Sequence, residues 1–360
     1  MARRRVHVLL LNMGGPDTLA DVRPFLFNLF SDPDLIPIPW WLRWLRVPLA
    51  WLIAKFRAPK SAENYARIGG GSPQKKYAAA VAQGVLPHLQ KAHPDITWST
   101  GIAMRFWHPM HDAVCRELNA AGFDEIVLVP LYPQYSVTTV RSSLKDFYRA
   151  ARKVGLKTPL RTLNYWYTDD AYVLSSAEAL RATLAQVPSE AGPPIILYSA
   201  HSIPMDRVQA GDPYPQQIND SLARIQRAAG LQPGDAALAY QSRVGPVEWQ
   251  GPSVDATLER LAREAPGRPL VIYPMSFVSD HIETLEEIDI GYRERAHELG
   301  LGGFYRVPVF NDRPEFIARF ATMIGHFSTT PAGSYVCQTG SGTRCQCDPH
   351  LAGVCSAHPH

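Results

Sequence analysis

The chain has 360 residues, a net charge of +3, 46% hydrophobic residues and 19% charged residues. This composition excludes a disordered protein, and the small net charge without a long Lys/Arg run excludes a strongly basic nucleic-acid-binding protein. Because one hydrophobic core rarely fills a chain of this length, we expect two domains. The apolar residues 6–11 after the basic N-terminus are too few for a signal peptide, and no segment is suited to span a bilayer, so we expect a cytoplasmic protein.

Short apolar runs alternate with longer helical patterns along the chain. The runs are rich in Val, Ile and Leu on both faces, which is typical of parallel strands covered by helices. The expected strands are residues 7–11, 125–130, 194–198 and 269–273. The expected helices are residues 73–92, 110–121, 176–186 and 215–229. This order predicts an α/β doubly wound fold, and its weak repetition predicts two Rossmann-like halves that face each other across a cleft.

Residues 35–53 carry four of the chain's eight tryptophans, together with arginines and prolines. A buried core helix is one interpretation of this segment. Trp and Arg at close spacing, interrupted by Pro39 and Pro48, are more typical of a surface that meets lipid head groups and acyl chains. The prolines and charges make the segment unsuitable for spanning a bilayer. We therefore expect it to face a membrane surface.

A histidine follows each of the two later strands. SAHSIP (199–204) follows strand 194–198, and SDHIET (279–284) follows strand 269–273. Open α/β sheets bind their ligands beyond the carboxyl ends of strands, and histidine both titrates near neutral pH and binds transition metals. One histidine at such a place is more often a buried structural residue. His201 and His281 together with the Glu283 carboxylate are better explained by one shared site that handles protons and a metal.

Acidic residues continue after His281 at helical spacing. If a helix begins here, Glu283 and Glu287 lie four residues apart on one face, and Asp280 lies one turn earlier. Asp280 is also a candidate N-cap for that helix. A solvated helix face is the alternative interpretation for Glu286 and Glu287.

Four of the five cysteines lie near the end of the chain, in the pattern C-x7-C-x-C-x7-C: Cys337, Cys345, Cys347 and Cys355. The fifth, Cys115, is expected to be a small buried core residue. Four thiols in a Gly/Ser-rich tail indicate either a metal centre or two disulfides. Disulfides are rare in cytoplasmic proteins, which argues against the second option. Zinc sites usually contain C-x2-C pairs, so this spacing fits zinc poorly. His350, His358 and His360 are alternative metal ligands nearby.

Six further motifs occur in a fixed order: LNMGGP (11–16), YARIGGGSP (65–73), YPQYS (132–136), GDPYP (211–215), QSRVGP (241–246) and WQGP (249–252). Together with the two histidine segments, they resemble the ferrochelatase family, whose members insert ferrous iron into a porphyrin to make haem. The resemblance runs from about Val6 to about Phe327.

The resemblance implies a chelatase-like fold of two Rossmann-like domains, each a parallel sheet flanked by helices, with the active-site cleft between them. The implied N-terminal domain covers residues 1–172 and includes residues 35–53 as a hydrophobic lip over the porphyrin pocket. The implied C-terminal domain covers residues 173–308. A C-terminal helix at 309–330 would return to the first domain, and residues 331–360 would form a cysteine-rich, cluster-binding tail.

The resemblance also implies a lyase that distorts protoporphyrin IX, removes its two pyrrole protons and inserts Fe(II). His201 and Glu283 would be catalytic residues and metal ligands, and the further catalytic residues would be His281, Asp280 and Glu287. Gly291 stands where the family often has a third acid. The implied porphyrin-binding residues are the wall residues Met13, Tyr135, Trp249 and Phe277 and the propionate partners Arg67, Ser142 and Arg149. Arg67 could equally pair with an acidic surface residue.

Finally, the resemblance implies a [2Fe–2S] cluster on the four tail cysteines and contact of the lip with the inner face of the cell membrane. A homodimer is a candidate assembly, and the small net charge gives no reason to expect a nucleic-acid partner. Four alternatives stay open at this point. The substrate could be coproporphyrin III, or the inserted metal could be cobalt or zinc. The protein could also be a non-catalytic tetrapyrrole- or haem-binding module, or an iron–sulfur electron carrier that needs only the tail.

Overall fold

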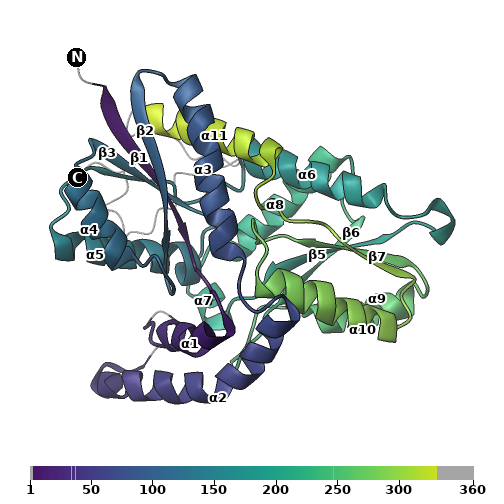
Figure 1. Cartoon of the computed structure of the whole chain (residues 1–360). Coiled ribbons are helices and arrows are strands. Elements are labelled where there is room, and N and C mark those ends of the chain that lie inside the picture. Colours follow the sequence, from purple (N-terminus) through teal and green to yellow (C-terminus); the bar gives the residue numbers. More distant parts are fainter. Residues whose placement is uncertain (1–2, 34, 37, 246, 331–360) are drawn as a thin grey trace.

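The computed structural model describes residues 3–330, apart from 34, 37 and 246. Within these residues the strands form two four-stranded sheets whose neighbouring strands all run parallel (Figure 1). The first sheet, in the order β2-β1-β3-β4, contains β1 (Arg4–Asn12), β2 (Ile96–Met104), β3 (Glu125–Pro130) and β4 (Leu160–Thr162). The second, in the order β6-β5-β7-β8, contains β5 (Ile195–His201), β6 (Ala236–Gln241), β7 (Pro269–Pro274) and β8 (Gly303–Arg306).

The two sheets repeat the same strand order, which confirms an α/β fold built from two Rossmann-like halves. The four strands expected from the sequence are β1, β3, β5 and β7, which are the two central strands of each sheet. They are buried almost throughout, as the continuous apolar runs predict. Both β1 and β5 end at the same edge of their sheets, where the candidate residues follow.

Helices connect the strands and cover the sheets. Those of the first half are α1 (Val22–Phe30), α2 (Arg46–Arg67), α3 (Gln74–Ala92), α4 (His111–Ala121) and α5 (Ser142–Val154). Those that follow are α6 (Asp170–Leu184), α7 (Met205–Gln209), α8 (Tyr214–Ala229), α9 (Val254–Glu264), α10 (Arg293–Glu298) and α11 (Pro314–Thr329). Shorter 3-10 turns are η1 (Leu19–Asp21), η2 (Trp40–Leu45) and η4 (Ser189–Ala191), and π-helical segments are η3 (Val137–Arg141) and η5 (Glu283–Tyr292).

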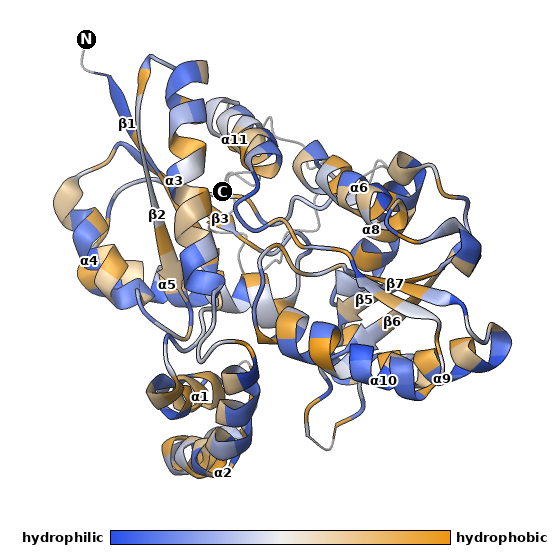
Figure 2. Ribbon diagram, turned by 45° about the vertical axis from the view of Figure 1, so that its right-hand side comes forward, coloured by the Kyte–Doolittle hydropathy of each residue, from blue (hydrophilic) through white to orange (hydrophobic). Residues whose placement is uncertain are grey.

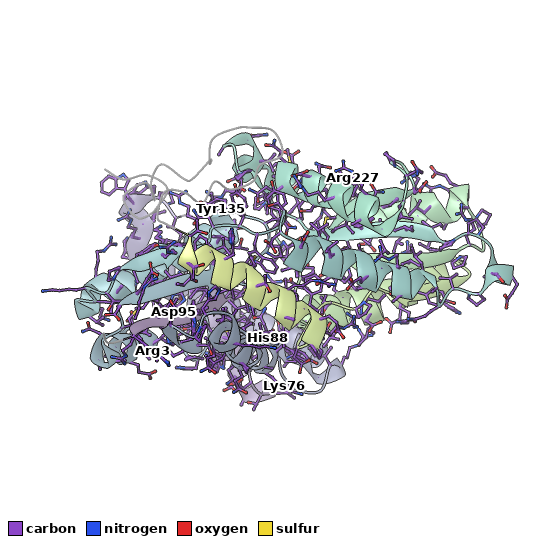
Figure 3. All side chains as sticks on the ribbon, turned by 90° about the horizontal axis from the view of Figure 1, so that it is seen from above. Arg3, Lys76, His88, Asp95, Tyr135 and Arg227 are labelled. Atoms are coloured by element: carbon purple, nitrogen blue, oxygen red, sulfur yellow. The ribbon has the colours of Figure 1, made fainter. Side chains whose placement is uncertain are left out.

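Helix α11 joins the two halves. It packs against α3 of the first half and against α6, and Figure 3 shows it lying along the side of both halves. Its rings Phe316 and Phe320 stack on each other, and Phe320 lies 4.9 Å from Trp166. The Arg161 guanidinium of β4 donates to the carbonyls of Phe327 and Thr330 at the end of the helix. The division of the chain at residue 172 stays a prediction, and that position falls inside α6.

Helices α1 and α2 project from the layers that cover the first sheet (Figures 1 and 2). The tryptophans of η2 lie on this projection, with Trp40, Trp41 and Trp44 77%, 60% and 72% exposed. The interpretation of this segment as a buried core helix is therefore wrong. Pro48 does not interrupt α2, because it lies in the first turn, where backbone N–H groups need no helical partner. Among the described helices, none is both long and apolar enough to cross a membrane.

Candidate active site

His201 is the last residue of β5, one of the two central strands of the second sheet. Its Nδ1 donates to the Ser202 carbonyl, which leaves Nε2 to face Glu283 at 3.5 Å from Oε1. The Ser276 hydroxyl accepts from the His201 backbone N–H, and the Tyr214 hydroxyl donates to the His201 carbonyl. The backbone N–H and the carbonyl of His201 are thus both hydrogen-bonded, and the edge of its ring faces the Glu283 carboxylate.

Glu283 lies between two histidines. Its Oε1 faces His201, and its Oε2 lies 3.0 Å from Nε2 of His281. The Phe277 ring covers this group, with its centroid 4.7 Å from the His281 ring and 6.4 Å from the His201 ring. Segments that are eighty residues apart in the sequence therefore form one cluster of two imidazoles and a carboxylate, as the sequence pattern indicates.

His201 and Glu283 each stabilise the charged form of the other. Burial alone would lower the pKa of His201, but the neighbouring negative charge of Glu283 outweighs burial and raises this pKa to about 9. Burial would raise the pKa of Glu283, yet His201 and His281 hold it well below its usual range. At neutral pH the substrate-free protein therefore holds an imidazolium–carboxylate pair at the end of β5.

Glu287 is held by four hydrogen-bond donors, none of which follows from the spacing of the acidic residues. The Ser242 backbone N–H donates to Oε1 at 2.8 Å and its hydroxyl to Oε2 at 2.6 Å, and the Tyr292 hydroxyl donates to Oε1 at 3.1 Å. The Gln241 amide donates both to Glu287 Oε2 and to the Glu283 carbonyl, so it links the two acids. Even so, burial raises the pKa of Glu287, and the charge of Glu283 raises it further.

For Ser242, the one signal in the sequence is its place in the QSRVGP motif. It lies in the QSRVGP motif directly after β6, at the same sheet edge as His201, and its φ of 63° is a conformation that few residues other than glycine adopt. Such backbone strain persists where surrounding contacts fix it, and here the contacts are the two hydrogen bonds to Glu287. The spacing of residues alone could not reveal that β6 supplies these donors.

The expectation that Asp280 caps the helix is wrong. The helical segment begins later, its N-cap is Ile282, and no side chain caps it. Asp280 instead accepts hydrogen bonds from Thr284, Asn311 and Arg306, the last at 2.9 Å. It therefore anchors the start of the segment to the end of the second sheet. The segment itself is π-helical rather than α-helical.

The apolar wall candidates are spread over both halves. Met13 follows β1 and packs, partly buried, on the cluster of α1 and α2. Trp249 is half-buried and pairs through its backbone with Pro204, and its buried indole N–H has no hydrogen-bond partner among the described residues. Tyr135 is buried where the halves meet, and its backbone N–H donates to Gln217 of α8 (Figure 3).

The three propionate candidates already have partners. Arg67 pairs with Glu286 and Glu294. Arg149 is exposed and pairs with two aspartates of the first half. The Ser142 hydroxyl is buried and donates to Asp32.

Within the described residues, no group of three or more His, Cys, Asp or Glu side chains is arranged to hold a metal ion. The four tail cysteines lie outside the described residues.

Comparison with known proteins identifies the family that this chain resembles. The family model described as Ferrochelatase matches residues 5–327. The curated ferrochelatase of a Synechococcus species is 44% identical over 333 residues, covering 91% of this chain and 95% of the relative. Those of Picosynechococcus and Synechocystis are each 43% identical, over 326 and 327 residues, covering 89% of this chain and 82% of each relative.

Among solved structures, SirB from Bacillus subtilis with Fe3+ superposes with a TM-score of 0.52 at 12% identity, covering 91% of this chain and 96% of that one. The sirohydrochlorin chelatase SirB of subspecies spizizenii in complex with cobalt gives a TM-score of 0.51 at 10% identity, covering 92% and 98%. At such identity the likeness concerns the fold, which is that of chelatases. The family match and an identity of 43–44% over about nine-tenths of the sequence decide the assignment. This chain belongs to the ferrochelatase family, the porphyrin metal-chelating lyases that insert iron into a porphyrin.

Proposed function

We propose that this enzyme inserts Fe(II) into protoporphyrin IX, with His201 and Glu283 as the reacting groups. The observation that carries the proposal is the Glu283 carboxylate held between His201 and His281 at the end of β5. Metallation requires a group that attracts a dication and groups that accept the two pyrrole protons. An ionised carboxylate beside an imidazole provides both within one cluster.

The ion pair suggests the order of events. Fe(II) is attracted to the ionised Glu283, and once the carboxylate binds the dication it no longer stabilises the positive charge of His201. The imidazolium then loses its proton to solvent, and the neutral ring accepts one pyrrole proton from a porphyrin bent to expose its nitrogens. Glu287 is suited to take the second proton, because a buried carboxyl with a raised pKa holds a proton more readily than an exposed one.

The wall and propionate roles belong to the same proposal. Met13, Tyr135, Trp249 and Phe277 would contact the faces and edges of the macrocycle. Ser142 and Arg149 would bind propionates only by exchanging their present partners for the substrate carboxylates.

One experiment tests the proposed substrate: rates of iron insertion into protoporphyrin IX and coproporphyrin III, measured side by side on the purified full chain. We expect the higher kcat/KM with protoporphyrin IX. A higher value with coproporphyrin III would replace the substrate while retaining the reaction. Binding of either porphyrin without insertion of iron would contradict both. The same preparations, analysed by sedimentation, test whether the chain is the proposed homodimer.

The exposed aromatic face of η2 and α2 supports a membrane contact, which would place the enzyme on the inner face of the cell membrane. The face combines tryptophans with cations: the Arg23 guanidinium lies 5.1 Å and the Lys55 ammonium 5.3 Å from the Trp51 ring. Aromatic rings with nearby cations suit an interface with anionic lipid head groups.

Replacing Trp40, Trp41 and Trp44 together with Ser is expected to weaken binding to anionic phosphatidylglycerol vesicles and to raise the KM for the apolar porphyrin. The reason is the loss of exposed rings that would enter the lipid interface. Co-sedimentation with vesicles measures the first effect. The matched control is Leu174→Ser, which removes an exposed apolar side chain of α6. Equal co-sedimentation of the triple variant and this control would rule out a lipid-binding role for the lip.

We also propose that Cys337, Cys345, Cys347 and Cys355 ligate a [2Fe–2S] cluster. The tail supplies four thiolates, the number that such a cluster needs. The remaining thiol, that of Cys115, is buried in the first half, and burial raises its pKa to about 12, so it is poorly suited to metal binding.

The protein purified without oxygen is expected to be brown, because thiolate-bound ferric iron absorbs visible light. Changing any one of the four tail cysteines to Ser should bleach or destabilise the colour, since a hard oxygen replaces a soft sulfur ligand. Cys115→Ser is the matched control and should keep the colour. Colourless protein with one zinc per chain would show a zinc site instead, and loss of colour in the Cys115 variant would show a different ligand set.

A further inference from the structure

Arg67 connects the two halves at the helical segment that carries the acidic residues. It is the last residue of α2, in the first half. Its Nη1 donates to Glu286 Oε1 at 2.8 Å, and its Nη2 donates to Glu294 Oε1 at 2.7 Å. Glu286 lies in η5 and Glu294 in α10, so a single guanidinium bridges the π-helical segment and the α-helix that follows it.

The segment η5 is thereby held from two directions. On one side, Gln241 and Ser242 at the end of β6 bind Glu287 and the Glu283 carbonyl. On the other side, Arg67 binds Glu286, the neighbour of Glu287. The residue after Arg67, Ile68, belongs to the same apolar cluster as Ile282, which directly precedes Glu283. The end of α2 therefore packs near the start of η5, and Arg67 adds an ion pair to its fourth residue.

The two ion pairs depend on the helical register. A π-helix closes i→i+5 hydrogen bonds and turns less per residue than an α-helix. The two nitrogens that Arg67 uses lie on one planar fork, so both carboxylates must lie on the same side of the helix. An α-helical register over residues 283–292 would rotate Glu286 away from Glu294. The same rotation would carry Glu283 and Glu287 away from their partners in the second sheet.

We propose that Arg67 is a positioning residue for iron insertion: it holds η5 in the π-helical register that places Glu283 against His201. This inference rests on the proposed roles of Glu283 and His201. Of the two ion pairs, the one with Glu286 contributes more, because the Glu286 side chain is 14% exposed whereas that of Glu294 is 62% exposed.

A propionate-binding role for Arg67 predicts different kinetics. If Arg67 bound a substrate carboxylate, its loss would raise the KM for the porphyrin. Glu286 and Glu294 would then compete with the substrate for Arg67, so their neutralisation would lower the KM. If Arg67 positions η5, its loss and the neutralisation of its two partners have the same effect, which falls on kcat.

The test compares Arg67→Gln, the double variant Glu286→Gln with Glu294→Gln, and the charge swap Arg67→Glu with Glu286→Arg in steady-state iron insertion. We expect the first two to lower kcat by about tenfold, equivalent to about 1.4 kcal/mol, with the porphyrin KM unchanged. The charge swap should recover part of the lost kcat, because it restores the ion pair between α2 and η5.

The matched control is Arg319→Gln. Arg319 of α11 also donates through both terminal nitrogens, at 2.7 and 2.6 Å, to Glu178 of α6, at a comparable exposure. This variant loses an inter-helix ion pair away from η5 and should keep the wild-type kcat. Thermal unfolding of all variants checks that each is folded.

Two outcomes would overturn the inference. A raised KM in Arg67→Gln with a lowered KM in the double glutamine variant would assign Arg67 to propionate binding. A wild-type kcat in both would leave Arg67 without a part in the reaction. Glu283→Gln in the same assay separates the two levels: if it is inactive while Arg67→Gln is normal, only the positioning role fails, and if it is fully active, the proposed site itself fails.

Discussion

His201→Ala is expected to lower the rate of iron insertion by roughly 10²- to 10⁴-fold, the range usual for loss of a general base. The substitution removes the ring that Glu283 faces, and with it the proposed acceptor for a pyrrole proton. The fold should be retained, because the side chain is 35% exposed at the end of β5 and its truncation leaves no closed cavity in the core. Porphyrin absorbance reports the rate, and thermal unfolding reports the fold.

The matched control for this variant is His297→Ala. His297 is an exposed histidine of α10, so its replacement removes an imidazole without touching the cluster. Its rate should equal that of the wild type. If His201→Ala keeps a rate within about tenfold of the wild type, a loss below the range for a general base, then His201 is not the proton acceptor.

Glu283→Gln is expected to reduce turnover as severely. The amide keeps the shape of the side chain but can neither carry the negative charge that attracts Fe(II) nor ligate it with comparable strength. It also removes the charge that raises the pKa of His201. The variant should therefore bind porphyrin normally and insert iron slowly, which porphyrin titration and single-turnover rates with Fe(II) measure separately.

Replacing the neighbouring acids Glu287 and Glu286 is expected to reduce turnover less than replacing Glu283. Glu287→Gln should matter less, since Ser242 and Gln241 still hold the side chain. Glu286→Gln should matter least of the three, because Glu286 acts only through Arg67, and its loss should stay below the roughly tenfold expected for the double variant, in which the Glu294 pair is lost as well. Equal losses at all three positions would contradict a line of acids that starts at Glu283.

The sequence predicts those strands whose surroundings are apolar on both faces. β1, β3, β5 and β7 lie inside their sheets, so Val, Ile and Leu occupy nearly every position. The edge strands β2, β4, β6 and β8 were not predicted, and for β2 and β6 the reason lies in their composition. β2 reads ITWSTGIAM, with polar residues and a glycine in its middle, and β6 reads AALAYQ, whose alanines carry no preference for strands.

The same limit applies to the site. His201, His281 and Glu283 could be brought together from the sequence because parallel strands end at a common edge. The π-helical register of η5 could not, since its stabilising partners come from β6 and α2, far away in the sequence. Arg67 shows the consequence most clearly: its two glutamates lie more than two hundred residues away, and only the fold brings them within hydrogen-bond distance.

The position of α11 has a consequence for how the protein is made. The large apolar cluster that contains the core of the first sheet also includes Phe316, Phe320 and Ile324 of α11, which lie more than three hundred residues after β1. A ribosome releases the chain from the N-terminus, so the first sheet emerges long before the helix that covers it. Until α11 arrives, the apolar side of α3 lacks the helix that packs on it, and the Arg161 guanidinium has only its ion pair with Glu125. The packing of the nascent first half is therefore incomplete until α11 has been made.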